Sequence, residues 1–245
     1  MSNGRNWGQD MTLRPGWDRL KSAAMRTVRD PQTWGPLAVA GLLQINDSDR
    51  KISDWAVDHT PVFGSSKNAR DATGWTGQSL DTIFYVSLLA TPSGDAPGEW
   101  VRNKFRGAMV EFTGFTIANV SVDFLKDVSG RVRPSKSDDK SFPSSHARRS
   151  SADVTLATRN LDAMALPRHV RVPLKTGMYS LGLVSAWSRV EAQAHYPSDV
   201  LVGWALGHFW TAFIHDAFLY KEDPLFLMHF MPEPDGMQVR LRWRL

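Results

Sequence analysis

Three short segments in the middle of the chain concentrate groups that suit a phosphate oxyanion. They are residues 126–134 (KDVSGRVRP), 143–146 (PSSH) and 188–199 (SRVEAQAHYPSD). Together they supply cations, two histidines, hydroxyls and a helix start. Cations neutralise phosphate oxygens, hydroxyls hydrogen-bond to them, and a histidine can serve as nucleophile or as general acid. This combination favours binding and chemistry at phosphorus.

Three cations are the candidate phosphate ligands: Lys126, Arg133 and Arg189. Lys126 ends an apolar helical run, so its ammonium can reach inward from a helix C-terminus, although the helix dipole alone also favours a lysine there. Arg133 precedes a proline that keeps the backbone extended, which suits a guanidinium fork aimed at two oxygens. Taken by itself, Arg133 is equally compatible with an ordinary surface arginine.

The PSSH segment is predicted to start a helix with Ser144 as its N-cap. A capped helix start leaves N–H groups of the first turn unpaired, and these groups form an anion site. His146 follows directly. The alternative is an ordinary capped helix whose histidine faces solvent.

Pro197 suits the first position of another helix, which places Asp199 in its first turn. His195 lies just before that turn, so we expect Asp199 to accept a hydrogen bond from one of its ring nitrogens. Such a carboxylate fixes the tautomer and raises the basicity of the other nitrogen, as in nucleophile triads. A purely structural hydrogen bond between the two residues is the alternative.

Order and spacing together resemble a known signature. Lys126-x6-Arg133-Pro134, then PSSH, then Ser188-Arg189-x5-His195-x3-Asp199 is similar to the three-part motif of the phosphatidic acid phosphatase type 2 (PAP2) superfamily. That superfamily includes lipid phosphatases, bacterial class A acid phosphatases and vanadium haloperoxidases. The resemblance implies an all-α helical bundle with long loops.

The resemblance also implies roles for these residues. His195 would attack phosphorus and form a phosphohistidine, Asp199 would orient it, and His146 would protonate the leaving oxygen and then activate water. Charge on the phosphate would be neutralised without a metal cofactor, and vanadate would inhibit as a phosphate mimic. The phosphate-binding groups would be Lys126, Arg133, Ser144, Ser145 and Arg189.

Two features depart from the family pattern. Ser145 replaces the glycine of the usual PSGH block, and only eight residues separate Pro134 from Pro143. The serine still offers a backbone N–H, so we expect binding to survive with a changed substrate fit. Arg148 and Arg149 occupy positions where small residues are common; we expect them to face solvent or to bind extra negative charge on a larger substrate.

The leading functional hypothesis is a metal-independent phosphatase that hydrolyses a lipid-linked phosphomonoester or pyrophosphate. The alternatives are a broad-specificity soluble acid phosphatase, a vanadate-dependent haloperoxidase, and a non-catalytic binder of phosphate or lipid head groups if Ser145 blocks the pocket. The substrate is thus a phosphorylated small molecule or lipid, with peripheral membrane contact.

Composition bounds these readings. The chain has 245 residues, 42% of them hydrophobic, a net charge of +4 and no cysteine. The missing cysteines exclude disulfide scaffolds, thiol nucleophiles and zinc fingers. No histidine pair has metal-ligand spacing, His208 reads as a core group, and no broad basic stripe indicates a nucleic-acid partner.

The pattern predicts one PAP2-like domain over residues 1–245, with an N-terminal extension (1–30) and a C-terminal tail (233–245). Turn-rich loops are expected at 65–77, 91–98 and 131–145, and Trp7 and Trp17 are expected on the surface. The alternating end VRLRWRL predicts a short strand or extended tail with a basic face. Helices are predicted over 17–29, 77–90, 99–125 (with a bend at Gly107 or Gly114), 145–160, 170–190 and 197–217.

Membrane spans are expected to be absent. Apolar segments 107–125 and 200–218 both carry ionisable groups, which are costly in lipid, so they are predicted to be buried helices of a soluble bundle. The first ten residues show no signal-peptide pattern. We expect a periplasmic or cell-envelope location, with the cytoplasm as the alternative.

Overall fold

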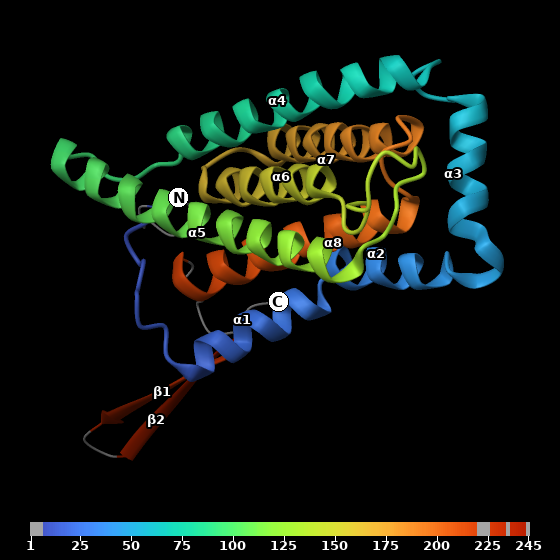
Figure 1. Ribbon diagram of the computed structural model, residues 1–245. Coiled ribbons are helices and arrows are strands. Elements are labelled where there is room, and N and C mark those ends of the chain that lie inside the picture. Colours follow the sequence, from blue (N-terminus) through green and yellow to red (C-terminus); the bar gives the residue numbers. More distant parts are fainter. Residues whose placement is uncertain (1–6, 220–225, 234–235, 244–245) are drawn as a thin grey trace.

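Helices α4 to α8 run lengthwise beside one another, and α3 crosses one end of this bundle (Figure 1). The computed structural model describes residues 7–219, 226–233 and 236–243. The elements are α1 (Trp17–Arg29), α2 (Pro31–Leu42), a 3-10 turn (Ile45–Asp47), α3 (Ser48–His59), α4 (Ser66–Ala90), α5 (Pro97–Ser129), α6 (Ser145–Ala163), α7 (Arg168–Glu191), α8 (Pro197–Ile214), a π turn (His215–Leu219), β1 (Phe226–Glu233) and β2 (Gly236–Trp243).

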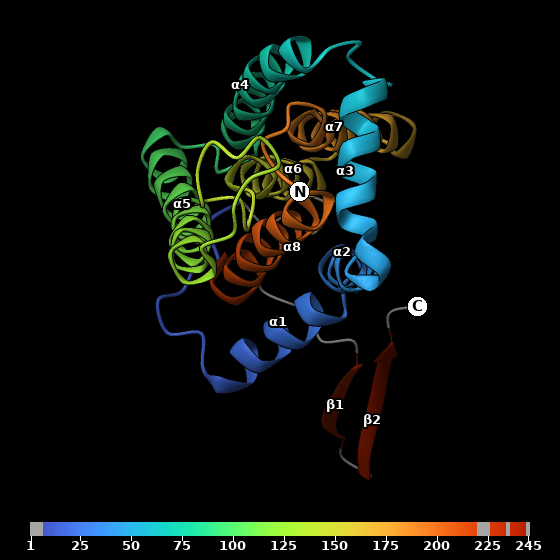
Figure 2. The same cartoon turned by 45° about the vertical axis from the view of Figure 1, so that its right-hand side comes forward.

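The central element is α6, which packs against α4, α5, α7 and α8. Every residue from Ser150 to Thr158 is buried. Some polar side chains in this stretch bond to neighbouring helices: Ser150 donates to Ser185 Oγ at 3.0 Å, and Thr155 contacts His208 Nδ1 at 2.9 Å. Figure 2 shows α3 in front of α7 and α8, with which it also packs. The predicted all-α bundle is therefore confirmed.

Two glycines bring α8 into backbone contact with α6. A Cβ atom at Gly203 would lie 2.4 Å from the carbonyl oxygen of Ser144, and one at Gly207 would lie 2.2 Å from the carbonyl oxygen of Arg148. Any side chain at either position would therefore push the start of α6 away from α8. The close approach holds the PSSH segment against the first turns of α8.

All six predicted helices are present, but α2 and α3 were not predicted, and the start of α4 differs substantially from the prediction. Helix α1 has the predicted bounds, whereas α4 begins at Ser66 and not at Gly77. The stretch was read as a loop because it is rich in Gly, Ser and Asn. Ser65 caps the helix by accepting the N–H of Asn68 at 3.1 Å, and packing on α6 and α7 outweighs the low helix propensity.

The glycines of α5 serve close packing and do not interrupt the helix. A Cβ at Gly107 would lie 2.1 Å from the ring of Trp7, and one at Gly114 would lie 3.2 Å from the Cα of Thr211 on α8. Trp7 is therefore buried, with only 3% of its surface exposed, and the prediction of a surface position was wrong for it. Trp17 is exposed as expected.

The alternating C-terminal pattern forms part of a hairpin. Strand β2 pairs antiparallel with β1, with Phe226 opposite Trp243. The predicted short strand is thus one half of a two-stranded sheet that projects from the helices (Figure 1). Residues 244–245 of the predicted basic tail lie outside the described residues.

One face of α5 is apolar and uncovered, contrary to the prediction of a buried helix. Exposed apolar side chains recur every three or four residues from Val101 through Phe112 and Val120 to Val128. Within the described part of the chain, α5 alone is long and apolar enough to cross a membrane, and only 28% of its most apolar 18-residue window is buried. An exposed apolar surface of this extent marks contact with a membrane or another protein.

We expect Gly203→Ala to lower the free energy of unfolding by about 1–3 kcal/mol, because the methyl group collides with the Ser144 carbonyl. Gly177→Ala is the matched control. It lies in α7 with no atom near the added Cβ and should gain up to about 1 kcal/mol in helix propensity. Urea unfolding measures both; equal effects of the two substitutions would contradict the close contact.

Candidate active site

Asp199 is the buried hub that joins the three sequence segments. Its side chain accepts the backbone N–H of Tyr196 at 2.9 Å, the hydroxyl of Ser141 at 2.5 Å and Nη1 of Arg131 at 2.6 Å. Its backbone carbonyl accepts the N–H of Ser144 at 2.9 Å. Burial raises the pKa of Asp199 above its ordinary value, while its hydrogen bonds and Arg131 oppose that shift. Asp199 thus ties the loop before α6, the start of α6 and the start of α8 together.

The predicted hydrogen bond between His195 and Asp199 is absent. His195 Nδ1 lies 4.0 Å from Asp199 Oδ2 and hydrogen-bonds instead to the backbone carbonyl oxygen of Ser141 at 2.6 Å. Because a carbonyl only accepts, Nδ1 must carry the proton and Nε2 keeps its lone pair. The orienting acceptor is therefore Ser141, and Asp199 acts one step away by binding the Ser141 hydroxyl.

His195 is almost fully buried and surrounded by positive charge. Burial lowers its pKa well below the ordinary value, and Arg189, Arg133 and Lys126 lower it further. Its bond to the neutral Ser141 carbonyl offsets only part of this shift. His195 is consequently a neutral imidazole with an unprotonated Nε2.

Arg133 and Lys126 come from the loop and helix end that cover this imidazole. Arg133 Nε donates to Asp138 at 2.6 Å, and its Nη1 contacts the Ala194 carbonyl at 2.8 Å and His195 Nε2 at 3.2 Å. Lys126, in the last turn of α5, donates to the carbonyl of Lys140 at 2.8 Å. Both cations therefore lie where the sequence predicted them, next to His195.

Arg189, near the C-terminus of α7, is the third predicted cation. Its Nη1 is 3.4 Å from the hydroxyl of Thr73, and its Nε is buried with no hydrogen-bond partner among the described residues. Burial, with help from Arg133 and Arg70, lowers its pKa to about 10, so it remains charged at neutral pH. A buried donor without an acceptor is ready to bind an anion.

The start of α6 faces the same space. Ser144 is the N-cap as predicted, and its hydroxyl accepts the N–H of Ala147 at 3.4 Å. The backbone N–H groups of Ser145 and His146 have no acceptor among the described residues. The Ser144 hydroxyl is thus engaged in capping, and the two amides without acceptors are the donors of this segment that are available to an anion.

His146 projects from the first turn of α6 with part of its ring open to solvent. Desolvation lowers its pKa to about 4, and the nearby Arg189, Arg149, Arg133 and Lys126 add to the effect. The structure thus brings two histidines into one field of positive charge. An anion that neutralises this charge will raise the pKa of His146 again.

Sequence reasoning missed a second buried network behind Asp199. Arg131 divides its guanidinium between Asp199 and Asp49, which lies 2.7 Å from Nη2, and it covers the ring of Tyr196 at 4.3 Å. Asp49 also accepts the backbone N–H and hydroxyl of Ser198 at 2.8 and 2.6 Å. Asp49, in α3, thus caps α8. The acidic run that contains it (46–54) carries no local sequence signal of a contact with α8.

Glu191 was also missed, although it positions the loop between α3 and α4. Its carboxylate accepts the N–H groups of Val62 and Phe63 at 3.0 and 3.1 Å, and Trp187 Nε1 at 2.6 Å. Because Glu191 ends α7 two residues after Arg189, it joins this loop to the side of the site that carries Arg189.

Of the two arginines that follow His146, Arg149 faces solvent as expected, whereas the prediction is wrong for Arg148. Arg148 is buried, donates to Asn119 Oδ1 at 3.0 Å and lies over the ring of Phe115. Arg149 makes two hydrogen bonds to Asp81 of α4. Arg148 therefore joins α6 to α5, and the charge of Arg149 is compensated by a protein carboxylate.

His208 and potential metal ligands were also considered in the sequence, and the structure describes both. His208 is 2% exposed and contacts the Thr155 hydroxyl at 2.9 Å, as expected for a core group. Among the described residues, no cluster of three or more His, Asp or Glu side chains could hold a metal ion.

Residues 108–223 match the family model described as PAP2 superfamily. This range contains the three segments that meet around His195, whereas Asp49, Arg70, Thr73, Asp81 and the loop held by Glu191 precede it. The chain belongs to the PAP2 superfamily. Its fold is similar to the crystal structure of a transmembrane PAP2-type phosphatidylglycerolphosphate phosphatase from Bacillus subtilis, with a TM-score of 0.55 and 18% identity over 75% of this chain and 92% of the other. No curated protein matches.

Each of the three sequence segments that resemble the PAP2 motifs has a defined place in this fold. The first motif supplies Lys126 and Arg133, the second starts α6, and the third connects the end of α7 to the start of α8. All three meet around His195.

We expect ring NMR signals to show His146 titrating near pH 4 and His195 remaining neutral down to a still more acidic pH. Arg149→Gln removes a positive charge that disfavours protonation and should therefore raise the pKa of His146. Arg50→Gln, an exposed position on α3, is the control and should leave it unchanged. Titration of both rings near the ordinary value of about 6.5 would contradict this electrostatic description.

Proposed function

We propose that this PAP2 protein is a metal-independent phosphohydrolase that cleaves a lipid-linked phosphomonoester or pyrophosphate through a phosphohistidine on His195. The observation that carries the proposal is the neutral His195, with Nδ1 bound to Ser141 and Nε2 facing Arg133 among three cations. A nucleophile needs a free lone pair, and a phosphate needs compensating charge.

In the first step, Nε2 of His195 attacks phosphorus in line, and the bond from phosphorus to the leaving oxygen breaks. Without substrate, Nη1 of Arg133 contacts Nε2 of His195; when substrate binds, the same N–H group donates to a phosphate oxygen instead. Lys126 and Arg189, with the free amides of Ser145 and His146, hold the other equatorial oxygens.

His146 supplies the proton. The bound phosphate raises its pKa from about 4, so it can be protonated in the complex and give the proton to the leaving oxygen. In the second step the neutral His146 takes a proton from water, the oxygen attacks phosphorus, and the N–P bond breaks with its electrons returning to Nε2. Atoms and charge balance without a metal ion.

The lipid-linked character of the substrate rests on the surface beside the site. The exposed apolar face of α5 runs to Phe124 and Val128, next to Lys126. The solved structure of similar fold is a transmembrane phosphatase named for a lipid phosphate, which supports a lipid phosphate as the substrate class here. We therefore propose that the protein acts at a membrane of the cell envelope. We also propose that the whole chain forms one catalytic domain, because α1 and α2 pack on α8.

A soluble acid phosphatase is the second candidate function. It is favoured by the mean hydropathy of −0.31, which is low for a membrane-embedded chain. The distinction lies in the substrate: a soluble enzyme would prefer small phosphomonoesters.

We expect His195→Ala to lower the rate of phosphate release by about a thousandfold or more, in buffer with EDTA, because the covalent step is lost. His169→Gln, an exposed histidine at the start of α7, is the control and should keep full activity. Release by His195→Ala at the parent rate would remove the nucleophile assignment.

His146→Ala should discriminate between leaving groups. Nitrophenolate departs without a proton, so p-nitrophenyl phosphate should still phosphorylate His195, while hydrolysis of the intermediate slows. Rapid-quench kinetics should show a burst of nitrophenol and an acid-labile phosphoprotein; an alkyl phosphate should show neither. Equal losses with both substrates would contradict the general-acid role.

A substrate panel separates the two candidate functions. We expect Phe124→Ser/Val128→Ser to lower kcat/KM at least fivefold on a long-chain lipid phosphate in vesicles, with p-nitrophenyl phosphate hydrolysed as before. Val62→Ser, which changes an exposed apolar side chain in the loop between α3 and α4, is the control. Parallel losses on both substrates, or a parent that prefers the soluble ester, would favour the soluble acid phosphatase.

A further inference from the structure

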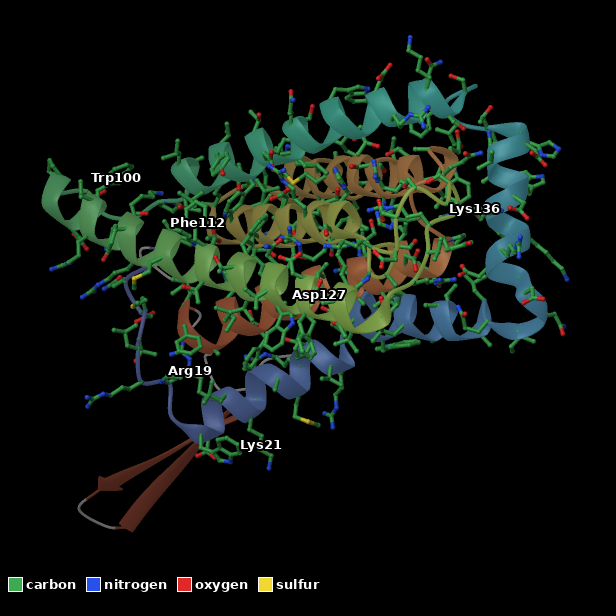
Figure 3. All side chains as sticks on the ribbon, in the orientation of Figure 1. Arg19, Lys21, Trp100, Phe112, Asp127 and Lys136 are labelled. Carbon is green, nitrogen blue, oxygen red and sulfur yellow. The ribbon has the colours of Figure 1, made fainter. Side chains whose placement is uncertain are left out.

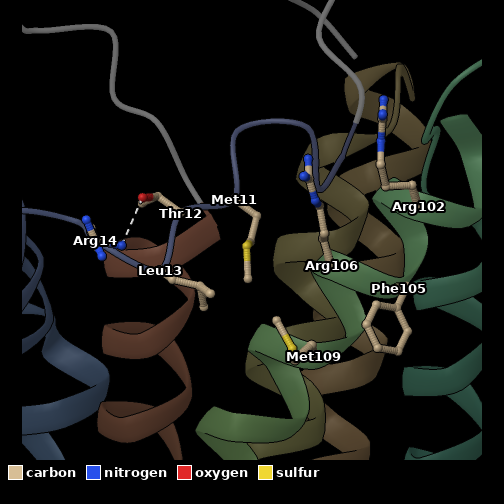
Figure 4. A pocket seen from close by; sticks show the side chains of 8 residues that line it. All are labelled: Met11, Thr12, Leu13, Arg14, Arg102, Phe105, Arg106 and Met109. Carbon is tan, nitrogen blue, oxygen red and sulfur yellow. Dashed lines mark hydrogen bonds between the residues drawn. The ribbon is translucent and has the colours of Figure 1, made fainter.

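A cavity lies at the end of α5 that is remote from His195. It has a volume of about 580 Å³ and is formed between residues 11–14 and the first turns of α5 (Figure 4). Arg106 precedes Lys126 by 20 residues, which is about 30 Å along a helix. In Figure 3, Trp100 and Lys136, a residue of the loop beside the site, lie toward opposite ends of the helices. The cavity is therefore distinct from the phosphate site.

Three arginines line this cavity: Arg14, Arg102 and Arg106. Among the described residues, none of their guanidinium groups has an ion-pair or hydrogen-bond partner. Arg102 and Arg106 are four residues apart on one helix, a spacing at which like charges repel. In Figure 4 their side chains extend in the same direction. An anion bound between them would relieve this repulsion.

The intervening cation, Lys104, does not share this role. It is buried, and its ammonium donates to the carbonyls of Leu88 and Thr91, each at 2.7 Å. Its charge thus compensates the C-terminus of α4. The unpaired positive charge at this end of α5 belongs to the three arginines.

Apart from Thr12, the other side chains that line the cavity are apolar. Met11 and Met109 point toward one another across it, and Phe105 lines the same helix with 69% of its surface exposed. Trp17 and Trp100, in the adjoining parts of α1 and α5, are also exposed. Arginine and tryptophan beside exposed apolar side chains are typical of the membrane–water interface.

We infer that this cavity binds one membrane phospholipid with an anionic head group. Arg14, Arg102 and Arg106 hold the phosphate, and the acyl chains leave over Phe105 and Met109 along the exposed face of α5. The separation of about 30 Å from the phosphate site equals the thickness of a bilayer core, so the lipid belongs to the leaflet opposite the one that faces His195. This binding is independent of hydrolysis at His195.

The test uses dihexanoyl-phosphatidylglycerol, a phosphodiester, at concentrations where it is monomeric. The purified 245-residue chain is titrated in buffer with inorganic phosphate, which occupies sites that accept the free anion. A rise in Tm gives Kd by mass action, and native mass spectrometry gives stoichiometry. We expect one bound lipid, with at least tenfold weaker binding of dihexanoyl-phosphatidylcholine and of the glycerophosphoglycerol head group alone.

Arg102→Gln/Arg106→Gln should raise Kd at least tenfold. Lys51→Gln/Lys67→Gln, which removes the same charge from exposed positions on α3 and α4, should change Kd less than twofold. If the double arginine variant is unstable, Arg14→Gln is measured instead, since an exposed side chain before α1 does not support the fold, and a loss of at least threefold is expected.

The outcomes divide cleanly. Equal binding by the arginine and lysine variants would mean that the lipid binds elsewhere and would overturn the inference. Equal binding of lipid and head group would make the cavity a simple anion site, and equal binding of the zwitterionic lipid would make it an apolar groove; either result contradicts an anionic phospholipid site.

Discussion

The buried carboxylate of Asp199 is the constraint on which the site depends. A charge removed from water needs several donors, and Asp199 finds them in three different parts of the chain: Arg131, Ser141 and the backbone of Tyr196. Satisfying this one group therefore assembles the loop, the start of α8 and, through its carbonyl, the start of α6. The geometry around His195 thus follows from the need to satisfy a buried charge.

Local signals in the sequence predicted local structure well. Ser144 before α6 and Pro197 at the start of α8 are read correctly, because capping and proline preferences involve only neighbouring residues. Contacts between distant residues were invisible. Asp49 caps a helix that begins 148 residues later in the chain. The acceptor of His195 is a backbone carbonyl, a group that every residue has, so the sequence gives no sign of it.

Errors in the fold have the same origin. The first turns of α4 have the composition of a loop and become helical through packing on α6 and α7. Gly107 was predicted to bend the helix, but its missing side chain instead leaves space for the ring of Trp7. In α5 the ionisable groups suggested burial, yet the helix sorts its residues by face: its small residues pack on α8 and Trp7, and its bulky apolar residues remain exposed.

The acceptor of His195 has a consequence for how the site can change. Because Nδ1 is bound by the main chain of Ser141, no single side-chain replacement can delete its partner. The tautomer of the imidazole is therefore set by the path of the loop between α5 and α6, which the side chains of Arg131 and Ser141 hold in place through Asp199. A movement of that loop would remove the acceptor of Nδ1 without any change in His195 itself.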